Sequence, residues 1–297
     1  MAASDTEVKE TRTCSRCRSR PAVYLRSSSG EALCRRCLWD EVVAQSARAV
    51  SGAGPGPRSR FLVPVSSFAP SSSLIAAAVL SSIERRFPST VIVAVPSFYG
   101  RDLAGRLKPD ERLQVINFYV TPPPPPESDI ISCIRYDRAW SARAAASVGA
   151  EIVVLPLSRT DLTAALLEAL LTDRPEGVFD SQASYNALGV RFLSLFSMVE
   201  REAVAALEYL EGLLVPPACR PLVLTKAVLM SIAGAPERDY GGLVIPIELA
   251  RAVRSPTACA ACGAPSREPL CQSCGSLGLG SLDVRPLGRH PGATALK

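Results

Sequence analysis

Residues 61–87 read FLVPVSSFAPSSSLIAAAVLSSIERRF, and this stretch gives the strongest indication of the fold. Its first residues form a short apolar run of the kind found in buried strands, and its second half has the length and apolar character of a helix. A Ser-rich loop joins the two. Because a helix N-terminus offers free N–H groups and the positive end of the helix dipole, such a loop is where α/β proteins often hold a phosphate.

The central region continues to alternate between strand and helix patterns. Strands are predicted at 61–65, 90–95, 113–119, 151–156 and 190–195, and helices at 72–86, 135–148, 160–171 and 197–211. Runs such as VIVAV (91–95) and EIVVLPL (151–157) indicate strands that are buried on both faces. The sequence therefore predicts an α/β domain with a doubly wound, mostly parallel sheet covered by helices. We expect the last helix to begin with a capping box formed by Ser197 and Glu200 and to end at Gly212.

Size and charge narrow the possible classes of protein. The chain has 297 residues, 47% of them hydrophobic, which is enough for one substantial core with small appendages. A net charge of +5, carried mostly by Arg, fits a polyanionic partner such as RNA, or equally an Arg-rich genome. The N-terminus is polar, and no run of about 18 uncharged apolar residues occurs. We therefore expect no signal peptide and no membrane partner, and a cytoplasmic location.

Eight of the ten cysteines form four CxxC pairs. Two residues between thiolates let both sulfurs reach one tetrahedral ion from a tight turn, so this spacing predicts two structural zinc sites in a reducing compartment. Redox-active or disulfide-bonded pairs are the alternative. The first site would use Cys14, Cys17, Cys34 and Cys37. The second site would use Cys259, Cys262, Cys271 and Cys274.

These patterns divide the chain into five parts. They are an N-terminal zinc module with a helix (1–50), a Gly/Pro-rich linker (51–60), the α/β domain (61–253), a C-terminal zinc ribbon (254–276) and a flexible tail (277–297). The only histidine, His290, falls in the tail, so the sequence offers no Ser-His-Asp or Cys-His arrangement for catalysis.

This order of modules resembles the TtuA-type tRNA 2-thiouridine synthetases and the cytosolic tRNA 2-thiolation proteins of eukaryotes, across nearly the whole chain. AVYLRSSSGEALCRRC (22–37) and GVRFLSLFSMVEREAVAALEYLEGL (189–213) are similar to segments of that family. The resemblance implies a PP-loop, adenine-nucleotide α-hydrolase-like domain between two zinc modules. Family members use ATP to adenylate the 2-carbonyl oxygen of a wobble uridine in tRNA, and then add sulfur taken from a ubiquitin-like carrier.

The ATP loop of the family has changed in this chain. The family loop reads SGGxDS, and residues 66–71 read SSFAPS. Phe68 places a phenyl group where the backbone should touch phosphate, and Pro70 removes an N–H donor. Binding of ATP in the family manner is therefore not expected, and Ser66, Ser67 and Ser71 are the residual candidates for a nucleotide site.

Two further family sites have also changed. Where the family has a Gly-His-Asn-x-Asp-Asp element, only Asp161 survives, as a vestigial ligand or as a residue that stabilises a helix start. Active relatives use a Cys-x-x-Cys and a distant Cys to hold an iron–sulfur cluster or to act on sulfur, whereas Ile130 takes the first position here. Cys133 and Cys219 remain, which are too few for that cluster. They could form a disulfide, carry a persulfide, complete a site across an interface, or be buried apolar residues.

Together these changes predict a non-catalytic partner subunit in tRNA wobble-uridine 2-thiolation. The resemblance implies that it associates with an active paralogue, or with itself, and that it contacts tRNA and the ubiquitin-like sulfur carrier. One alternative is a divergent ATP-dependent thiolation enzyme. Another is an RNA-binding or assembly module outside thiolation, with a basic surface near the first zinc site. The arginines of that surface would be Arg16, Arg18, Arg35 and Arg36, although a solvated face has the same pattern.

Overall fold

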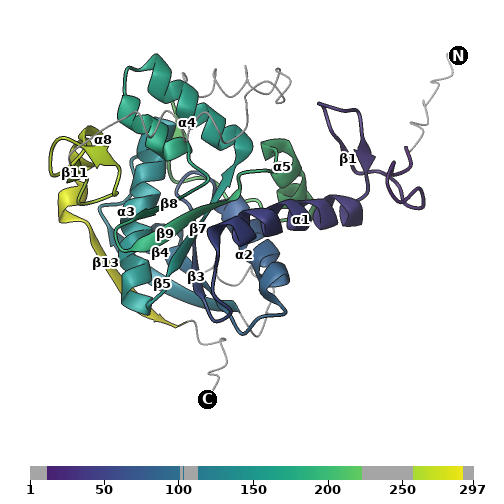
Figure 1. The fold of residues 1–297 in the computed structure, drawn as a ribbon, viewed down its shortest axis with the longest axis horizontal. Helices are drawn as coiled ribbons and strands as arrows, with labels where there is room; N and C mark the ends of the chain where they lie inside the picture. Colours follow the sequence, from purple (N-terminus) through teal and green to yellow (C-terminus); the bar gives the residue numbers. More distant parts are fainter. Residues whose placement is uncertain (1–11, 101–102, 104–112, 223–256, 290–297) are drawn as a thin grey trace, which may run out of the picture.

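The computed structural model describes residues 12–100, 103, 113–222 and 257–289. A seven-stranded sheet with the order β13-β5-β4-β3-β7-β9-β8 forms its centre (Figure 1). The strands are β3 (Arg60–Pro64), β4 (Thr90–Pro96), β5 (Leu113–Thr121), β7 (Ile152–Ser158), β8 (Ser184–Ala187), β9 (Val190–Phe196) and β13 (Asp283–Arg289). Strands β5 to β9 in this order run parallel, and β8 and β13 add antiparallel edges. The predicted α/β class with a mostly parallel sheet is confirmed.

Helices cover both faces of the sheet (Figure 1). They are α1 (Arg35–Ala53), α2 (Pro70–Glu84), α3 (Ile130–Val148), α4 (Arg159–Leu171) and α5 (Arg201–Leu210). Successive residues of a strand point to opposite faces, so Phe61 and Val63 pack with α1, α2 and α5, whereas Leu62 packs with α3 and α4. All three side chains are fully buried. The continuous apolar runs of the sequence therefore reflect burial on both sides.

The order of the strands reverses between β3 and β7. From β3 the chain adds β4 and β5 on one side, and it then returns to add β7 and β9 on the other side. In open parallel sheets, ligands bind outside the carboxyl ends of the strands at such a reversal. The loops after β3 and β7, where the sequence places its candidate nucleotide residues, both leave the sheet at this point.

The predicted start of the last helix is wrong. Helix α5 begins at Arg201, and its N-cap residue, Glu200, makes no side-chain capping hydrogen bond. Ser197 instead continues the turn that leaves β9, where its N–H donates to the carbonyl of Ser194 (3.2 Å). The predicted end is confirmed, because Gly212 adopts φ +68° just after the helix.

The prediction of a flexible tail from residue 277 is also wrong over its first part. Residues 279–281 form a short 3₁₀ helix, and β13 then pairs with β5, with Val284 opposite Val120. The added strand covers backbone groups that β5 would otherwise leave exposed at the edge of the sheet. His290 and the rest of the predicted tail lie outside the described residues, as do residues 223–253 of the predicted α/β domain.

The two four-cysteine modules occupy different positions. The N-terminal module contains the hairpin of β1 (Tyr24–Leu25) and β2 (Ala32–Leu33) and lies at the outer end of α1 (Figure 1). The C-terminal module, with β11 (Thr257–Ala258), β12 (Pro265–Ser266) and α8 (Gln272–Ser276), packs against α3. Among the described residues, no helix has the length and hydrophobicity that crossing a membrane requires.

Candidate functional site

The loop between β3 and α2 lies at the reversal point of the sheet, and its serines are inside the protein. Ser66 and Ser67 are 0% exposed and Ser71 is 7% exposed. Pro70 takes the first turn of α2, where a helix N–H has no partner within the helix. The proline that replaces the family Asp is therefore well suited to the helix start.

The carboxylate of Asp137, on α3, occupies this loop. Ser66 Oγ donates a hydrogen bond to Asp137 Oδ2 (2.6 Å), and the Ser67 N–H donates to both carboxylate oxygens (2.9 and 3.0 Å). These are donors that an anion such as phosphate would need at the loop. Sequence reasoning missed Asp137, although it lies four residues after Cys133, a spacing that puts both on one face of α3.

Burial has the largest effect on the pKa of the Asp137 carboxylate. It raises the pKa of Asp137 from 3.8 to about 6, while the hydrogen bonds from Ser66 and Ser67 lower it. Near neutral pH most of the carboxylate is ionised. The loop then holds a negative charge of its own, which repels a phosphate.

The other loop serines bond to the protein itself. Ser71 Oγ accepts a hydrogen bond from the Val215 N–H (2.9 Å), and Ser72 Oγ donates to Glu208 Oε1 (2.6 Å). Ser73 Oγ accepts from the backbone N–H of the first loop serine (2.9 Å). These hydroxyls connect the start of α2 to α5 and to the segment that follows it. The hydroxyl-rich loop therefore serves the packing of the fold.

A segment around residues 215–219 covers the loop from outside. The carbonyl of Ser67 accepts hydrogen bonds from the N–H groups of Ala218 (2.8 Å) and Cys219 (2.9 Å). The Tyr99 hydroxyl donates to the same carbonyl (2.9 Å), and burial raises the pKa of Tyr99, which keeps this donor protonated. The loop is thus enclosed by Asp137 on one side and by this segment on the other.

Asp161 forms a capping box at the start of α4. The Asp161 N–H donates to Ser158 Oγ (3.2 Å), and the Ser158 N–H donates to Asp161 Oδ2 (2.8 Å). Two free N–H groups of the helix start are satisfied in this way. Of its two predicted roles, the geometry matches the one that stabilises the helix.

Cys133 and Cys219 form a disulfide. Their Cα atoms lie 6.5 Å apart, and both residues are almost fully buried. The bond joins α3 to the segment that covers the loop. Ile130, which stands at the first position of the Cys-x-x-Cys that the resemblance implies, is 1% exposed and belongs to the hydrophobic core. Because Cys133 and Cys219 are bonded to each other, they supply no free thiolate here.

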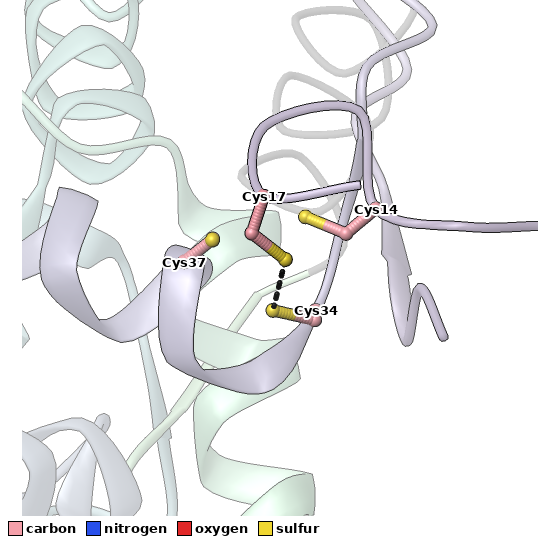
Figure 2. A group of neighbouring side chains, drawn as sticks. All are labelled: Cys14, Cys17, Cys34 and Cys37. Atoms are coloured by element: carbon pink, nitrogen blue, oxygen red, sulfur yellow. Dashed lines mark hydrogen bonds between the residues drawn. The ribbon is translucent and has the colours of Figure 1, made fainter. Parts of the chain in front are cut away.

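The remaining cysteines form two four-cysteine groups, each with all four sulfurs within 4.8 Å of one another. In the first group, the side chains of a turn and of the start of α1 converge, with Cys17 Sγ 3.8 Å from Cys34 Sγ (Figure 2). In the second, Cys262 Sγ lies 3.7 Å from Cys271 Sγ. A tetrahedron with metal–sulfur bonds of about 2.3 Å has edges of about 3.8 Å. Both groups could therefore hold a single metal ion.

The predicted basic surface beside the first group contains acidic partners as well. Arg16 and Arg35 each lie 2.6 Å from a carboxylate oxygen, of Glu41 and Glu211 respectively. Arg36 lies 3.8 Å from a carboxylate on its own helix. Arg18 is exposed and has φ +53°. This face therefore has both positive and negative side chains, and we expect it to attract phosphates less strongly than a purely basic surface would.

A groove of about 530 Å³ lies on this module. Trp39, half-buried, and Val23, 49% exposed, form apolar parts of its wall. Arg20, Arg35 and Arg36 line it together with one glutamate. An aromatic ring next to guanidinium groups is the chemistry that stacks an unpaired base and contacts its phosphates. Sequence reasoning missed Trp39, which directly follows the second CxxC pair and one leucine.

Comparison with known proteins identifies a similar fold. No protein-family model matches the sequence, and no curated protein is similar to it. Among solved structures, the chain is similar to the U34-tRNA thiolase NcsA from Methanococcus maripaludis with its [4Fe-4S] cluster. The TM-score is 0.65 with 16% sequence identity, over 92% of this chain and 97% of that one. The chain thus has an α/β fold similar to that of this tRNA thiolase, with a four-cysteine group near each end.

Proposed function

We propose that this chain is a non-catalytic subunit in the 2-thiolation of tRNA wobble uridine, where it supports an active PP-loop paralogue and helps to bind tRNA. The observation that carries the proposal is the Asp137 carboxylate, which takes the donors of the nucleotide loop in a fold similar to that of a U34-tRNA thiolase. In such a subunit the Asp137 side chain fills the nucleotide loop, so the chain can keep the fold of the enzyme without binding ATP.

Two further observations support a non-catalytic role. Asp161 Oδ2 accepts hydrogen bonds from the N–H and the hydroxyl of Ser158 in a capping box, so this carboxylate is used to stabilise the start of α4. Cys133 and Cys219 are bonded to each other, so neither is a free thiolate that could accept sulfur. The changes affect the activation and sulfur-transfer sites together, while the α/β core is intact.

We further propose that both four-cysteine groups bind zinc as structural ions. The sulfur–sulfur distances of 3.7 and 3.8 Å support one tetrahedral ion per group, because they match the edges expected for metal–sulfur bonds of about 2.3 Å. Two zinc ions per chain and no acid-labile sulfide are the expected result of metal analysis. Inorganic sulfide in the purified chain would instead indicate an iron–sulfur cluster.

A thiolation assay tests the proposed role. The chain is deleted from its cell and restored, and wobble 2-thiouridine is measured by mass spectrometry of digested tRNA. We expect the modification to be lost on deletion and restored by the parent chain. Co-purification should recover a paralogue with an intact SGGxDS loop, or show self-association, together with tRNA and the ubiquitin-like carrier. Unchanged 2-thiouridine and no associated thiolation protein would refute the proposal.

Titration with ATP and magnesium separates this role from that of a divergent enzyme. Because the loop is enclosed, we expect the chain not to bind ATP even at millimolar concentration. Saturable binding of ATP would favour the divergent enzyme.

The groove at Trp39 favours a second candidate function, an RNA-binding module outside thiolation. That candidate predicts salt-dependent RNA binding together with normal 2-thiouridine after deletion.

A further inference from the structure

The C-terminal four-cysteine group is part of the hydrophobic core. Its cysteines are at most 4% exposed and belong to the same core as α3 and α4. The N-terminal group lies in the module at the outer end of α1, and its buried cysteines belong to the core on the other face of the sheet (Figure 1). A metal ion at the C-terminal group would therefore lie in the protein interior, where the charges of the ion, its thiolates and the neighbouring side chains need to balance.

Helix α3 carries two fully buried arginines next to this group. Arg135 and Arg138 have fully buried side chains, and Arg135 Nη1 lies 3.4 Å from Cys271 Sγ.

One buried carboxylate faces these arginines. Asp180 lies 2.9 Å from Arg135 and 2.5 Å from Arg138, and its side chain is 0% exposed. The guanidinium of Arg138 also stacks over the ring of Tyr185, 4.5 Å from its centroid. In the described part of the chain, the ion pairs of these two arginines thus supply one negative charge for two buried positive charges. Buried charges without a counter-charge are strongly unfavourable.

We propose that the metal–tetrathiolate at the C-terminal group is the missing counter-charge of these arginines. A divalent ion with four thiolates has a net charge of −2. The two arginines and Asp180 together have a net charge of +1. The bound tetrathiolate therefore supplies the negative charge that these buried groups lack. The arginines act as positioning residues for the sulfurs around that ion.

This charge balance couples metal binding to the folding of the core. Without the ion, the arginines of α3 remain buried beside thiols and a single carboxylate, so the folded core loses much of its stability. Helix α3 also carries Asp137 and Cys133, so loss of the ion disturbs the enclosed loop as well. The N-terminal group has no fully buried arginine pair of this kind among the described residues. The inference holds whether or not the chain acts in thiolation.

The first test is a measurement of zinc affinity on the full chain. Cys14→Ser and Cys17→Ser remove the N-terminal site, and the remaining zinc is titrated with a competing chelator. We expect Arg135→Met to weaken zinc binding about 10- to 100-fold, as is typical when a partner of a metal ligand is removed. Arg201→Met is the matched control, because Arg201 pairs with Glu208 on the other face of the sheet. Its zinc affinity should equal that of the parent.

A double variant separates charge from packing. Arg135→Met with Asp180→Asn removes one charge of each sign and so restores the net charge of the parent, and its zinc affinity should return to within a few-fold of the parent. If the double variant binds no better than Arg135→Met, or if Arg135→Met binds as tightly as the parent, the inference is wrong. Circular dichroism after complete zinc removal gives an independent check, since a fully native helix signal would also overturn it.

Discussion

Replacing Asp137 with Asn tests whether burial controls the charge in the enclosed loop. The substitution keeps the shape of the side chain and removes its ionisable proton. In the parent, burial raises the pKa of Asp137 from 3.8 to about 6 even though Ser66 and Ser67 donate hydrogen bonds to it. The folded chain therefore keeps this proton to higher pH than the unfolded chain does. As a result, the free energy of unfolding of the parent falls as the pH rises, and the Asn variant lacks this contribution.

The size and sign of the effect follow from the two pKa values. The stabilisation from the proton is fully present below the unfolded pKa of 3.8 and is lost as the pH rises through about 6. At about 1.4 kcal/mol per pKa unit, the whole change is roughly 3 kcal/mol, of which roughly 1.4 kcal/mol falls between about pH 5 and pH 7.5. The parent should therefore lose about 1.4 kcal/mol relative to Asp137→Asn over that range.

Urea unfolding of both chains, with zinc present at several pH values between about 5 and 7.5, measures this difference. Asp40→Asn is the control, because the Asp40 side chain is 62% exposed and the substitution makes the same chemical change at the surface. A difference between parent and Asp137→Asn that stays constant with pH would refute the reasoning. A difference of opposite slope would mean that the donated hydrogen bonds outweigh burial.

Three further outcomes are expected. Cys133→Ala should lower the free energy of unfolding by roughly 4 kcal/mol under oxidising conditions, because the bond to Cys219 closes a loop of 86 residues, and reductant should have no added effect on the variant. Asp161→Ala should cost roughly 1 kcal/mol in urea unfolding by loss of the capping-box hydrogen bond from the Ser158 N–H, and it should leave RNA binding unchanged; the reverse pattern would indicate a ligand role. In a Trp140→Phe chain, tRNA should quench the fluorescence of Trp39, whereas unchanged emission with tRNA bound would locate the RNA elsewhere.

Local patterns predicted the core elements well. The predicted helix 72–86 is observed at Pro70–Glu84, and the predicted strand 90–95 is observed at Thr90–Pro96. Apolar runs and helical spacing depend only on neighbouring residues, so one sequence is enough to locate them. The four-cysteine groups were predictable for the same reason, because a CxxC pair brings its two sulfurs together within a single turn.

Elements that depend on distant partners were predicted less well. Residues 283–289 contain Pro286 and Gly288, which argue against a strand, yet β13 forms because β5 offers an unpaired edge. Ser197 and Glu200 have the spacing of a capping box, but the turn that leaves β9 already uses the backbone of Ser197. In both cases a backbone partner elsewhere in the fold determines the outcome.

The sequence by itself determined the α/β class, the two four-cysteine groups and the departures of residues 66–71 from a phosphate-binding loop. Only the tertiary structure decided what the loop does instead. Asp137 lies 71 positions after Ser66, and Asp180 lies 45 positions after Arg135, so no local pattern connects either pair. Their charges meet because α3 packs across the carboxyl end of β3 and beside the C-terminal module, where burial makes each unmatched charge costly.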